Sequence, residues 1–403
     1  MILSGMVKNK TIHSVDFKRS PFWFKAVNTA WNISYPLGTG IKLTKDKLIQ
    51  AAKRNTGLDD IGKDFHDEPL ERLLYSLNNE SALHPVGRFI TYRRLVNLIS
   101  VRLRAEYYFK KHPEILEQPL YPVMLIIGLQ RTGTTKLHRM LASDPDTRSL
   151  SSWEAINPAP MNGDIKTGAE RIKFAKMSEK ALKLMSPGFF AIHPIEHMSP
   201  EEDVLLLDVS FMSTTAEATM HVPSYAAWLE TIDQSPSYEY AVKLMKLLQW
   251  QKPAKKWVLK SPHHLEFPHL AEKYFKDVLF IWTHRNVFEA IPSFASMLAH
   301  ARALFSNKVE PEQITKHWIS KAGYALGKTI EYRKENEERF IDINYNDLVE
   351  DSLAVMNKIY KKRNLEIDCN LIEKFHLIEK RNPKSKYGVH KYKTEDFGIS
   401  IDF

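Results

Sequence analysis

Residues 123–139 read VMLIIGLQRTGTTKLHR: an apolar, β-branched run, a glycine-bounded loop and the start of a helix-like stretch. A strand that feeds such a loop gathers backbone N–H groups at the helix N-terminus, which predicts an anion site. Gly128 and Gly133 have the spacing of a Walker A loop, but Thr134 stands where that motif has its lysine. Kinases and ATPases use this lysine on the β- and γ-phosphates together with Mg²⁺. The loop therefore suits a different phosphate donor.

The sequence around this loop alternates between strand-like and helix-like runs. Apolar runs lie at 123–129, 256–261, 277–285 and 339–345, and a helix-like stretch follows each of them. Strands that alternate with helices favour a parallel sheet covered by helices on both faces. Ligands of such sheets bind beyond the carboxyl ends of the strands, where the loop already lies. We therefore predict an α/β fold.

Two further regions are mostly helical. Residues 44–118 are repeatedly amphipathic and contain no strand-like run, and residues 153–250 form a long insertion between the first two strands. We predict a helical N-terminal region at 1–118 and a sheet domain at 119–403 that carries the insertion.

The composition narrows the class of protein. The chain has 403 residues, a formal net charge of +9 and a pI near 9.2, which favour anionic partners. Basic residues are scattered and no zinc-finger, RRM or helix-turn-helix signature is present, so we expect no nucleic-acid partner. A single cysteine, Cys369, excludes an internal disulfide and a cysteine-based metal cluster, and it fits a reducing compartment.

The N-terminal residues bear on localisation. MILSGMVKNK lacks the layout of a signal peptide and no run reaches the length of a membrane span, so we expect a cytoplasmic protein. The segment SPFWFKAVNTAWNISYPLG (20–38) clusters aromatic and apolar side chains. It is either an interfacial membrane anchor or a helix that packs on the main domain or lines an acceptor pocket. We favour the second interpretation and keep peripheral membrane contact as the alternative.

Two arginines are the strongest site candidates. Arg131 lies within the loop, where a guanidinium can make paired hydrogen bonds to phosphate or sulfate oxygens without a metal. In FIWTHRNVFEAIPSFASM (280–297), Arg285 falls just past a strand and Ser293 lies eight residues further on, so the two residues can clamp a second phosphate. Taken alone, each residue has an ordinary structural explanation. Arg131 could be an exposed arginine in a tight turn, Arg285 a surface salt-bridge residue, and Ser293 a hydroxyl on a helix face.

Together these segments support a named resemblance. YPVMLIIGLQRTGTTKLHRML (121–141) and WVLKSPHHLEFPHLAEKYFKDVLFIWTHRNVFEAIPSFASM (257–297) resemble the sulfotransferase superfamily that uses 3′-phosphoadenosine 5′-phosphosulfate (PAPS). The chain is most similar to the bacterial branch with a Pro-Arg-Ser/Thr-Gly-Thr-Thr loop. VPSYAAWLE, INYNDLVEDS and KYGVHKYKTEDFG extend the resemblance over most of the chain after residue 120. Gln130 stands where the family commonly has proline.

The resemblance implies a P-loop-like parallel sheet and a PAPS-dependent O-sulfotransferase that requires no metal. It implies that the 5′-phosphosulfate is held by Arg131, Thr132, Gly133, Thr134 and Thr135. It places Arg285 and Ser293 on the 3′-phosphate, and Lys386, Tyr387 and Gly388 in a tail that closes over the nucleotide. The absent Walker lysine is then no defect, because the helix N-terminus and Arg131 can stabilise charge on the bridging oxygen.

The acceptor hydroxyl needs a base, and the resemblance suggests two candidates. Glu154, in RSLSSWEAINP, matches the carboxylate base of the tyrosylprotein and glycolipid branches. His263, beside His264 in LKSPHH, matches the region of the catalytic histidine in the hydroxysteroid and phenol branch. We rank Glu154 first and His263 second. The structural alternatives are that Glu154 is a charge at the start of a helix and that the histidines are local caps. We predict that Lys260 is an electrostatic helper near the leaving group. The acidic cluster at 201–203 is interpreted as a helix N-terminus without a catalytic role.

The acceptor is the least constrained part of the hypothesis. Aromatic and Met residues between about 180 and 250, with the aromatic N-terminus, favour an apolar small molecule with one hydroxyl, such as a sterol or lipid alcohol, although they also fit an ordinary core. Two alternatives stay open: a P-loop nucleotide kinase using Mg-ATP, which Thr134 disfavours, and a non-catalytic nucleotide- or membrane-binding module.

Overall fold

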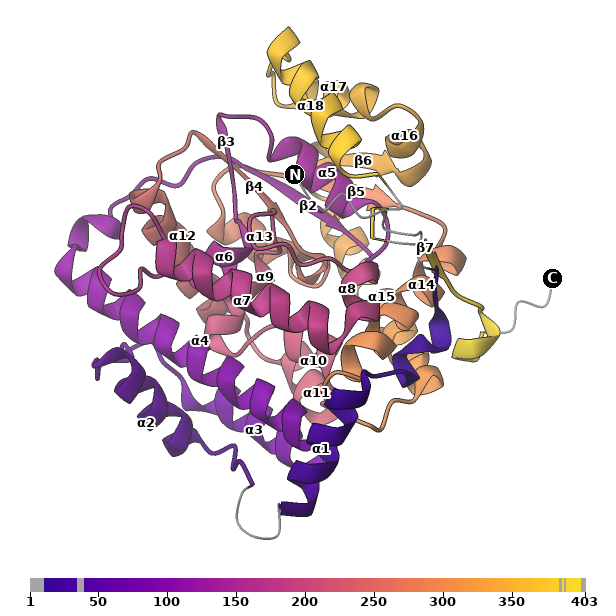
Figure 1. The fold of residues 1–403 in the computed structure, drawn as a ribbon. Coiled ribbons are helices and arrows are strands. Elements are labelled where there is room, and N and C mark those ends of the chain that lie inside the picture. Colours follow the sequence, from indigo (N-terminus) through magenta and orange to yellow (C-terminus); the bar gives the residue numbers. More distant parts are fainter. Residues whose placement is uncertain (1–10, 35–39, 384–385, 388, 400–403) are drawn as a thin grey trace, which may run out of the picture.

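The computed structural model describes residues 11–34, 40–383, 386–387 and 389–399, and its centre is a parallel sheet (Figure 1). The sheet has five strands in the order β3-β4-β2-β5-β6. They are Thr147–Ser149 (β3), Lys256–Lys260 (β4), Val123–Gly128 (β2), Val278–His284 (β5) and Phe340–Asn344 (β6). The predicted α/β fold is confirmed, and all four strands expected from the apolar runs form.

The central strand β2 explains why its sequence is apolar throughout. Its side chains alternate between two hydrophobic cores: Val123, Leu125 and Ile127 belong to one, and Met124 and Ile126 belong to the other. Both faces of the sheet are covered, so the strand has no solvent side that would require polar residues. Since β2 lies between β4 and β5, the loop that follows it opens at the middle of the carboxyl edge.

The N-terminal region is helical, as predicted. Helices α2 (Lys45–Thr56), α3 (Asp67–Asn79) and α4 (Pro85–Lys111) lie at one end of the molecule, and α1 (Phe22–Ser34) packs on α4 (Figure 1). Their apolar faces share one hydrophobic core with the sheet, which includes Leu48, Leu70 and Leu125. The domain boundary at 118/119 therefore stays a sequence-based prediction.

The predicted helical insertion between the first two expected strands also forms. Its helices are α6 (Ser152–Ile156), α7 (Ala169–Met185), α8 (Pro187–Ile192), α9 (Val204–Leu207), α10 (Thr215–Thr219), α11 (Pro223–Thr231) and α12 (Ser235–Gln251). Proline occupies the first turn of α8, α11 and α12, where its missing N–H costs no hydrogen bond.

The remaining helices follow the strands of the sheet. They are α5 (Thr134–Leu141), α13 (Pro268–Tyr274), α14 (Val287–Arg302), α15 (Pro311–Arg333), α16 (Tyr345–Glu350), α17 (Ser352–Lys362) and α18 (Cys369–Arg381). Helices α5, α16, α17 and α18 cover one face of the sheet, at the top of Figure 1. The longer helices α4, α12 and α15 belong to the opposite side.

A second, smaller sheet joins the first and the last described segments. Strand β1 (Thr11–His13) pairs in parallel with β7 (Val389–Lys391), and neither strand was predicted. Three residues are too few to establish a period-2 pattern, so such strands leave no signal in the sequence. Within the described ranges, no helix combines the length and the apolar character that crossing a membrane requires.

Candidate functional site

The loop between β2 and α5 is held in shape by strand β5. Gly128 has φ +146°, and a Cβ at this position would lie 2.2 Å from Thr283 Oγ1, so a side chain does not fit. Thr132 Oγ1 donates to Leu129 O (2.6 Å) and also shares a hydrogen bond with Thr283 Oγ1 (2.7 Å). Gly133 caps α5 with φ +91°, a conformation that glycine adopts without strain. The threonine and the glycines therefore fix the backbone of the loop.

Arg131 is held in an unusual conformation at the centre of the site. Its φ of +73° lies in the left-handed region, which is costly for a residue with a side chain and is typical of functional loops. Its Nε donates to Ser293 Oγ (3.1 Å) and its Nη1 donates to Ile192 O (3.3 Å). The structure thus brings together two predicted site residues that are 162 positions apart.

Arg285 packs against the same loop. Its Nη1 donates to Arg131 O (2.9 Å), its Nη2 donates to Glu289 Oε2 (2.7 Å), and its guanidinium lies 4.2 Å from the centre of the Tyr345 ring. Burial and the charge of Arg285 both lower the pKa of Arg131. Two neighbouring guanidiniums repel each other, and an anion between them would relieve this repulsion.

The start of α5 completes the polar side of the site. The first hydrogen bond into the helix runs from Leu137 N to Gly133 O (3.2 Å), which leaves the preceding N–H groups without an intrahelical acceptor. Thr134 and Thr135 line the cavity there. Lys136 does not take the place of a Walker lysine, because its Nζ donates to Leu348 O (2.9 Å) and pairs with Glu379.

The loop opens into a cavity of ≈ 830 Å³ with two chemically different ends. The polar end is lined by Arg131, Thr134, Thr135, Arg139, Arg285 and Tyr345. The apolar end is lined by Leu205, Phe294, Met297, Leu298, Ala301 and Phe305. Helix α14 joins the two ends, because Ser293 near its middle contacts Arg131 while Ala301 lies about two turns further along, near its end.

The C-terminal tail closes on the polar end through one carboxylate. Glu196 accepts hydrogen bonds from Arg139 Nη2 (2.8 Å), Lys386 Nζ (3.1 Å) and the Tyr387 hydroxyl. Burial would raise the pKa of Glu196, but the hydrogen bonds from Tyr387 and Lys386 outweigh it, and the pKa is lowered. Gly388, the third tail residue predicted to close over the nucleotide, lies outside the described residues.

The position of Glu154 argues against the prediction that it is the base. It is buried, and its two carboxylate oxygens accept from Arg148 Nη2 (2.7 Å) and from Ser151 N (3.1 Å). Ser151 and Glu154 form the capping box that begins α6. Although Ser152 and Ile156 of the same helix line the cavity, Glu154 points away to Arg148. The structure therefore favours the helix-start alternative for this residue.

Two carboxylates that sequence reasoning set aside line the cavity instead. The acidic cluster does precede a helix, as predicted, with Asp203 as the N-cap of α9, but Glu201 and Glu202 also face the cavity. Burial raises the pKa of Glu201. Glu202 Oε1 accepts from Lys260 Nζ (2.5 Å), so Lys260 lies one carboxylate away from the cavity. The sequence signal that could have identified Glu201 and Glu202 was the run of consecutive acidic residues before a short apolar helix.

A third cavity-lining group was also missed. His193 follows α8 and lines the cavity, and burial lowers its pKa to about 4. It is therefore neutral near pH 7, when one ring nitrogen can accept a hydrogen bond. A lone histidine after a helix carries no sequence pattern that would single it out.

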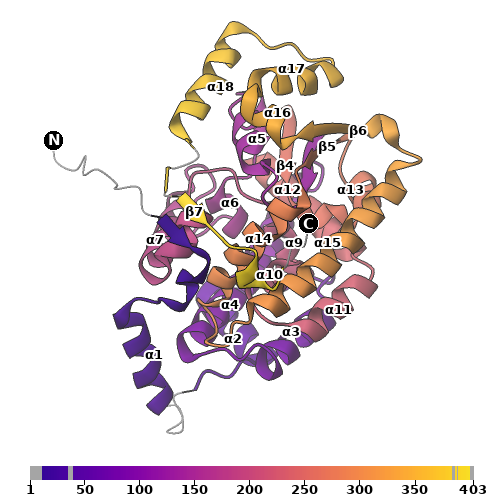
Figure 2. The same cartoon turned by 90° about the vertical axis from the view of Figure 1, so that its right-hand side faces the viewer.

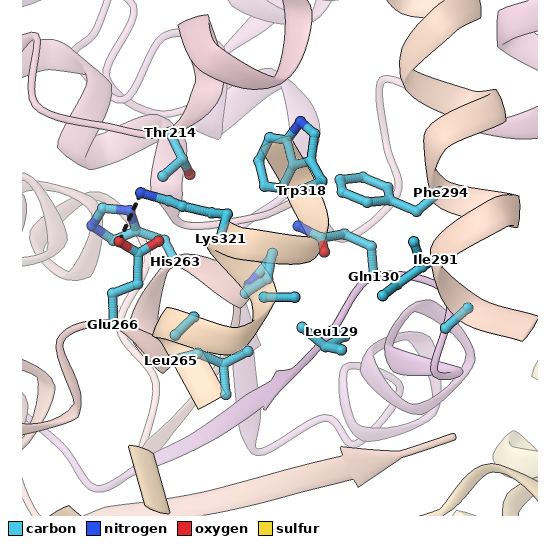
Figure 3. A pocket seen from close by; sticks show the side chains of 14 residues that line it. Leu129, Gln130, Thr214, His263, Leu265, Glu266, Ile291, Phe294, Trp318 and Lys321 are labelled. Atoms are coloured by element: carbon cyan, nitrogen blue, oxygen red, sulfur yellow. Dashed lines mark ion pairs between the residues drawn. The ribbon is translucent and has the colours of Figure 1, made fainter. Parts of the chain in front are cut away.

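Figure 3 shows where His263 lies, in a smaller cavity of ≈ 30 Å³ beside Gln130, Glu266 and Lys321. Neither of its ring nitrogens has a hydrogen-bond partner among the described residues, and burial holds its pKa well below the usual range. Gln130, Thr214 and Trp318 line both cavities, so the two adjoin.

His264, by contrast, is fully engaged. Its Nε2 pairs with Asp203 Oδ2 (2.6 Å) and its Nδ1 with the Tyr238 hydroxyl (2.7 Å), deep in the core. This network connects η5 (Pro262–Leu265) to α9 and α12. His264 therefore has a structural role, which leaves His263 as the histidine closer to the loop.

Known proteins share this architecture. The model of the sulfotransferase family matches residues 122–368, more than half of the chain. The crystal structure of sulfotransferase STF1 from Mycobacterium tuberculosis has a TM-score of 0.78 and 28% identity, and the match covers 89% of this chain and 96% of that one. Sulfotransferase STF9 from Mycobacterium avium shows the same fold, with a TM-score of 0.79 and 24% identity over 89% of this chain and 93% of that one. A search of the curated proteins found no match.

The matched segment contains every part of the polar end of the cavity that comes from the sheet edge: the loop with Arg131, then Arg285 and Ser293. The fold agrees with the two sulfotransferase structures over 89% of the chain. The loop, the paired arginines and the family match lead to one conclusion: the chain belongs to the sulfotransferase family.

Proposed function

We propose that this sulfotransferase transfers the sulfuryl group of PAPS to the hydroxyl of an apolar small molecule. The observation that carries the proposal is the single cavity whose wall is cationic at the loop and apolar along α14. The donor nucleotide would bind at the cationic end and the lipophilic acceptor at the apolar end. Their reacting groups would lie together between the two ends.

The polar end suits the two anionic groups of PAPS. Arg131, Thr134 and Thr135 would hold the 5′-phosphosulfate together with the N–H groups at the start of α5. Arg285 and Ser293 would hold the 3′-phosphate, since both already contact Arg131. The charge repulsion between the two guanidiniums fits an anionic ligand at this position.

PAPS, when bound, supplies an activated sulfuryl group and leaves as adenosine 3′,5′-bisphosphate. Arg131 would stabilise the negative charge on the donor oxygen, because its guanidinium is already held by Ser293 and Ile192. Lys260 would act through Glu202, which it holds by an ion pair of 2.5 Å. These roles require no metal ligand from the chain.

The proton of the acceptor hydroxyl must leave as the new S–O bond forms. We assign this step to Glu201, because it lines the cavity and because its raised pKa makes it a stronger base than an exposed carboxylate. His263 is the alternative base, since neither ring nitrogen has a hydrogen-bond partner in the described part of the chain and its small cavity adjoins the large one.

The acceptor end favours a sterol, lipid alcohol or similar molecule. Its lining along α14 is formed by Phe294, Met297, Leu298 and Ala301, which offer contact area but no hydrogen bonds. Apolar contacts of this kind contribute roughly 25 cal/mol for each Å² removed from water. A glycan would lose hydrogen bonds to water there without replacing them.

Isothermal titration with adenosine 3′,5′-bisphosphate and with ATP, each with and without Mg²⁺, tests the donor. We expect metal-independent binding of the bisphosphate. Loss of a hydrogen bond to a charged group costs about 1.5–3 kcal/mol, so Arg131→Ala and Arg285→Ala should each weaken binding by about tenfold or more. Arg72→Ala is the matched control, because Arg72 forms an exposed pair with Glu68 on α3.

Three results would each reject part of this assignment. Undiminished affinity in both site variants would exclude the arginines from the nucleotide site. Preference for Mg-ATP would favour the kinase alternative. Binding of PAPS without sulfation of sterols, lipid alcohols or glycans would favour a non-catalytic module.

A further inference from the structure

Helix α1 exposes an unusually apolar face to solvent. Phe22 is 87% exposed and Ile33 is 74% exposed, and Trp23 and Val27 are exposed on the same helix. At about 100° per residue, these four side chains fall within a continuous arc of roughly 140°, which Ala26 and Ala30 complete. We call this arc the α1 apolar face.

The opposite side of α1 is fixed to the body of the protein. Phe24 is buried with its ring 5.5 Å from that of His84, and Asn28 Oδ1 accepts from Val86 N (3.1 Å). Both contacts join α1 to the start of α4. Figure 2 shows α1 standing out at the edge of the molecule, so its apolar face is presented outward in a fixed orientation.

The charged side chains near this face are mostly basic. The sequence from Phe17 to Lys45 contains no Asp or Glu, and it contains five Lys or Arg residues. Lys18 and Arg19 precede the helix and Lys25 lies within it, all three exposed, and Arg19 also pairs with Asp16 (3.2 Å). Aromatic side chains flanked by exposed basic residues are typical of helices that lie in the interface of an anionic membrane. A water-soluble partner would not require this combination.

The anchored side of α1 lies near the apolar end of the cavity. The segment that precedes α1, η1 (Ser14–Lys18), packs on α8 and α14, and both of these helices line the cavity. Phe17 of η1 meets His300 of α14 with ring centres 6.0 Å apart. On the other side, Phe305 lines the cavity and its carbonyl accepts from His84 N (3.0 Å), beside the anchor of α1.

We propose that α1 docks the protein on the surface of an anionic lipid bilayer, with Phe22, Trp23, Val27 and Ile33 in the interface. The basic residues Lys18, Arg19 and Lys25 would contact the lipid headgroups. Docking would bring the apolar end of the cavity close to lipids, from which a hydroxyl-bearing acceptor can enter. Delivery of the acceptor rests on the proposed function, whereas docking itself does not.

Co-sedimentation of the full chain with vesicles tests the docking. We expect binding to vesicles of phosphatidylcholine with phosphatidylglycerol, and at least tenfold weaker binding to phosphatidylcholine alone. The double variant Phe22→Ser/Ile33→Ser should lower the partition coefficient for anionic vesicles at least tenfold. Ile330→Ser is the matched control, because Ile330 is an exposed isoleucine on α15 and should leave the partition unchanged.

The outcomes separate docking from the alternatives. A wild-type chain that stays in the supernatant with anionic vesicles overturns the proposal, as does a double variant that partitions like the wild type. If the wild type sediments as a dimer and the double variant as a monomer, the α1 apolar face would be assigned to a second copy of the chain instead. Vesicle binding needs no nucleotide, so titration with the bisphosphate shows separately whether the proposed function holds.

Discussion

Two glutamates in neighbouring parts of the chain show how environment decides the role of a residue. Both carboxylate oxygens of Glu154 accept hydrogen bonds, one from Arg148 and one from the backbone at the start of α6. Glu201 instead lines the cavity, and burial raises its pKa. The sequence pattern S-x-x-E already marks Glu154 as part of a capping box. The resemblance to distant branches favoured Glu154, whereas its contacts in the structure favour the helix-start alternative.

Glu201→Gln should lower kcat by about 10²–10⁴-fold and leave the affinity for adenosine 3′,5′-bisphosphate unchanged. A base must be deprotonated, and burial raises the pKa of Glu201, so wild-type kcat should fall as the pH drops through this raised value. That acid limb should disappear in the variant. A pH profile of kcat for both proteins measures this.

Glu154→Gln is the matched control. Removing the charge leaves Arg148 buried without its partner, which should lower the free energy of unfolding by about 3 kcal/mol while kcat changes little. Chemical denaturation and steady-state kinetics measure the two effects. If Glu154→Gln abolishes turnover in a fully folded protein and Glu201→Gln does not, the assignment is reversed.

At the scale of elements, the predictable parts are those that bury a long apolar run. β2, β4, β5 and β6 form where the sequence has such runs, and α2 to α4 form where it is amphipathic. Strand β3, at the edge of the sheet, has three residues, TRS, with no apolar pattern. It forms because its register with β4 places Arg148 opposite Trp257, a tertiary effect that no local pattern encodes.

A further prediction concerns helix α14, whose residues contact both ends of the cavity. Ala301→Phe would fill the apolar end from a small residue that lines it, while Ser293 at the other end keeps its contact with Arg131. We expect kcat/KM for an apolar acceptor to fall by about tenfold or more, which is 1.4 kcal/mol, with unchanged bisphosphate affinity.

Thermal unfolding of Ala301→Phe shows whether the larger ring is accommodated. A stable variant with normal turnover of a sterol or lipid alcohol would mean that the acceptor does not occupy this end. A loss of bisphosphate affinity would mean that the two ends are not independent.

At the scale of the whole molecule, buried histidines should make the fold sensitive to acid. Burial lowers the pKa of His84 to about 4 and that of His138 to about 3, from an ordinary value of 6.5. Below pH 6.5 the unfolded chain binds protons that the folded chain does not, so stability is present above pH 6.5 and is lost as the pH falls. From pH 7 to pH 5 each histidine should cost about 2 kcal/mol.

His84→Asn separates this effect from helix capping. His84 is the N-cap of α4 and its Nδ1 accepts from Gly87 N (2.8 Å), a role that asparagine fills well. The variant should therefore lose less stability than the wild type between pH 7 and pH 5, as measured by denaturant midpoints. An equal loss in both proteins would mean that His84 is not one of the groups responsible.

The site was predictable only in the parts that follow the strands of the sheet. Arg131 and Arg285 come directly after β2 and β5, and Ser293 lies in the helix after β5, so their meeting at the carboxyl edge follows from the fold. Glu201, Glu202 and His193 come from the helical insertion, whose path depends on how its helices pack. Because sequence patterns describe elements and not their packing, these residues were found only in three dimensions.

The pairing of β1 with β7 has a consequence for how the protein is made. These strands hold the first and last described segments together, with Thr11 opposite Val389, and the same tail carries Lys386 and Tyr387 to Glu196. Contacts between such distant positions form late. During translation the sheet and its loop can fold while the ribosome is still working, but β7 can pair with β1 only after Lys391 has left the exit tunnel. A nascent chain should therefore form its sheet well before the tail is held in place.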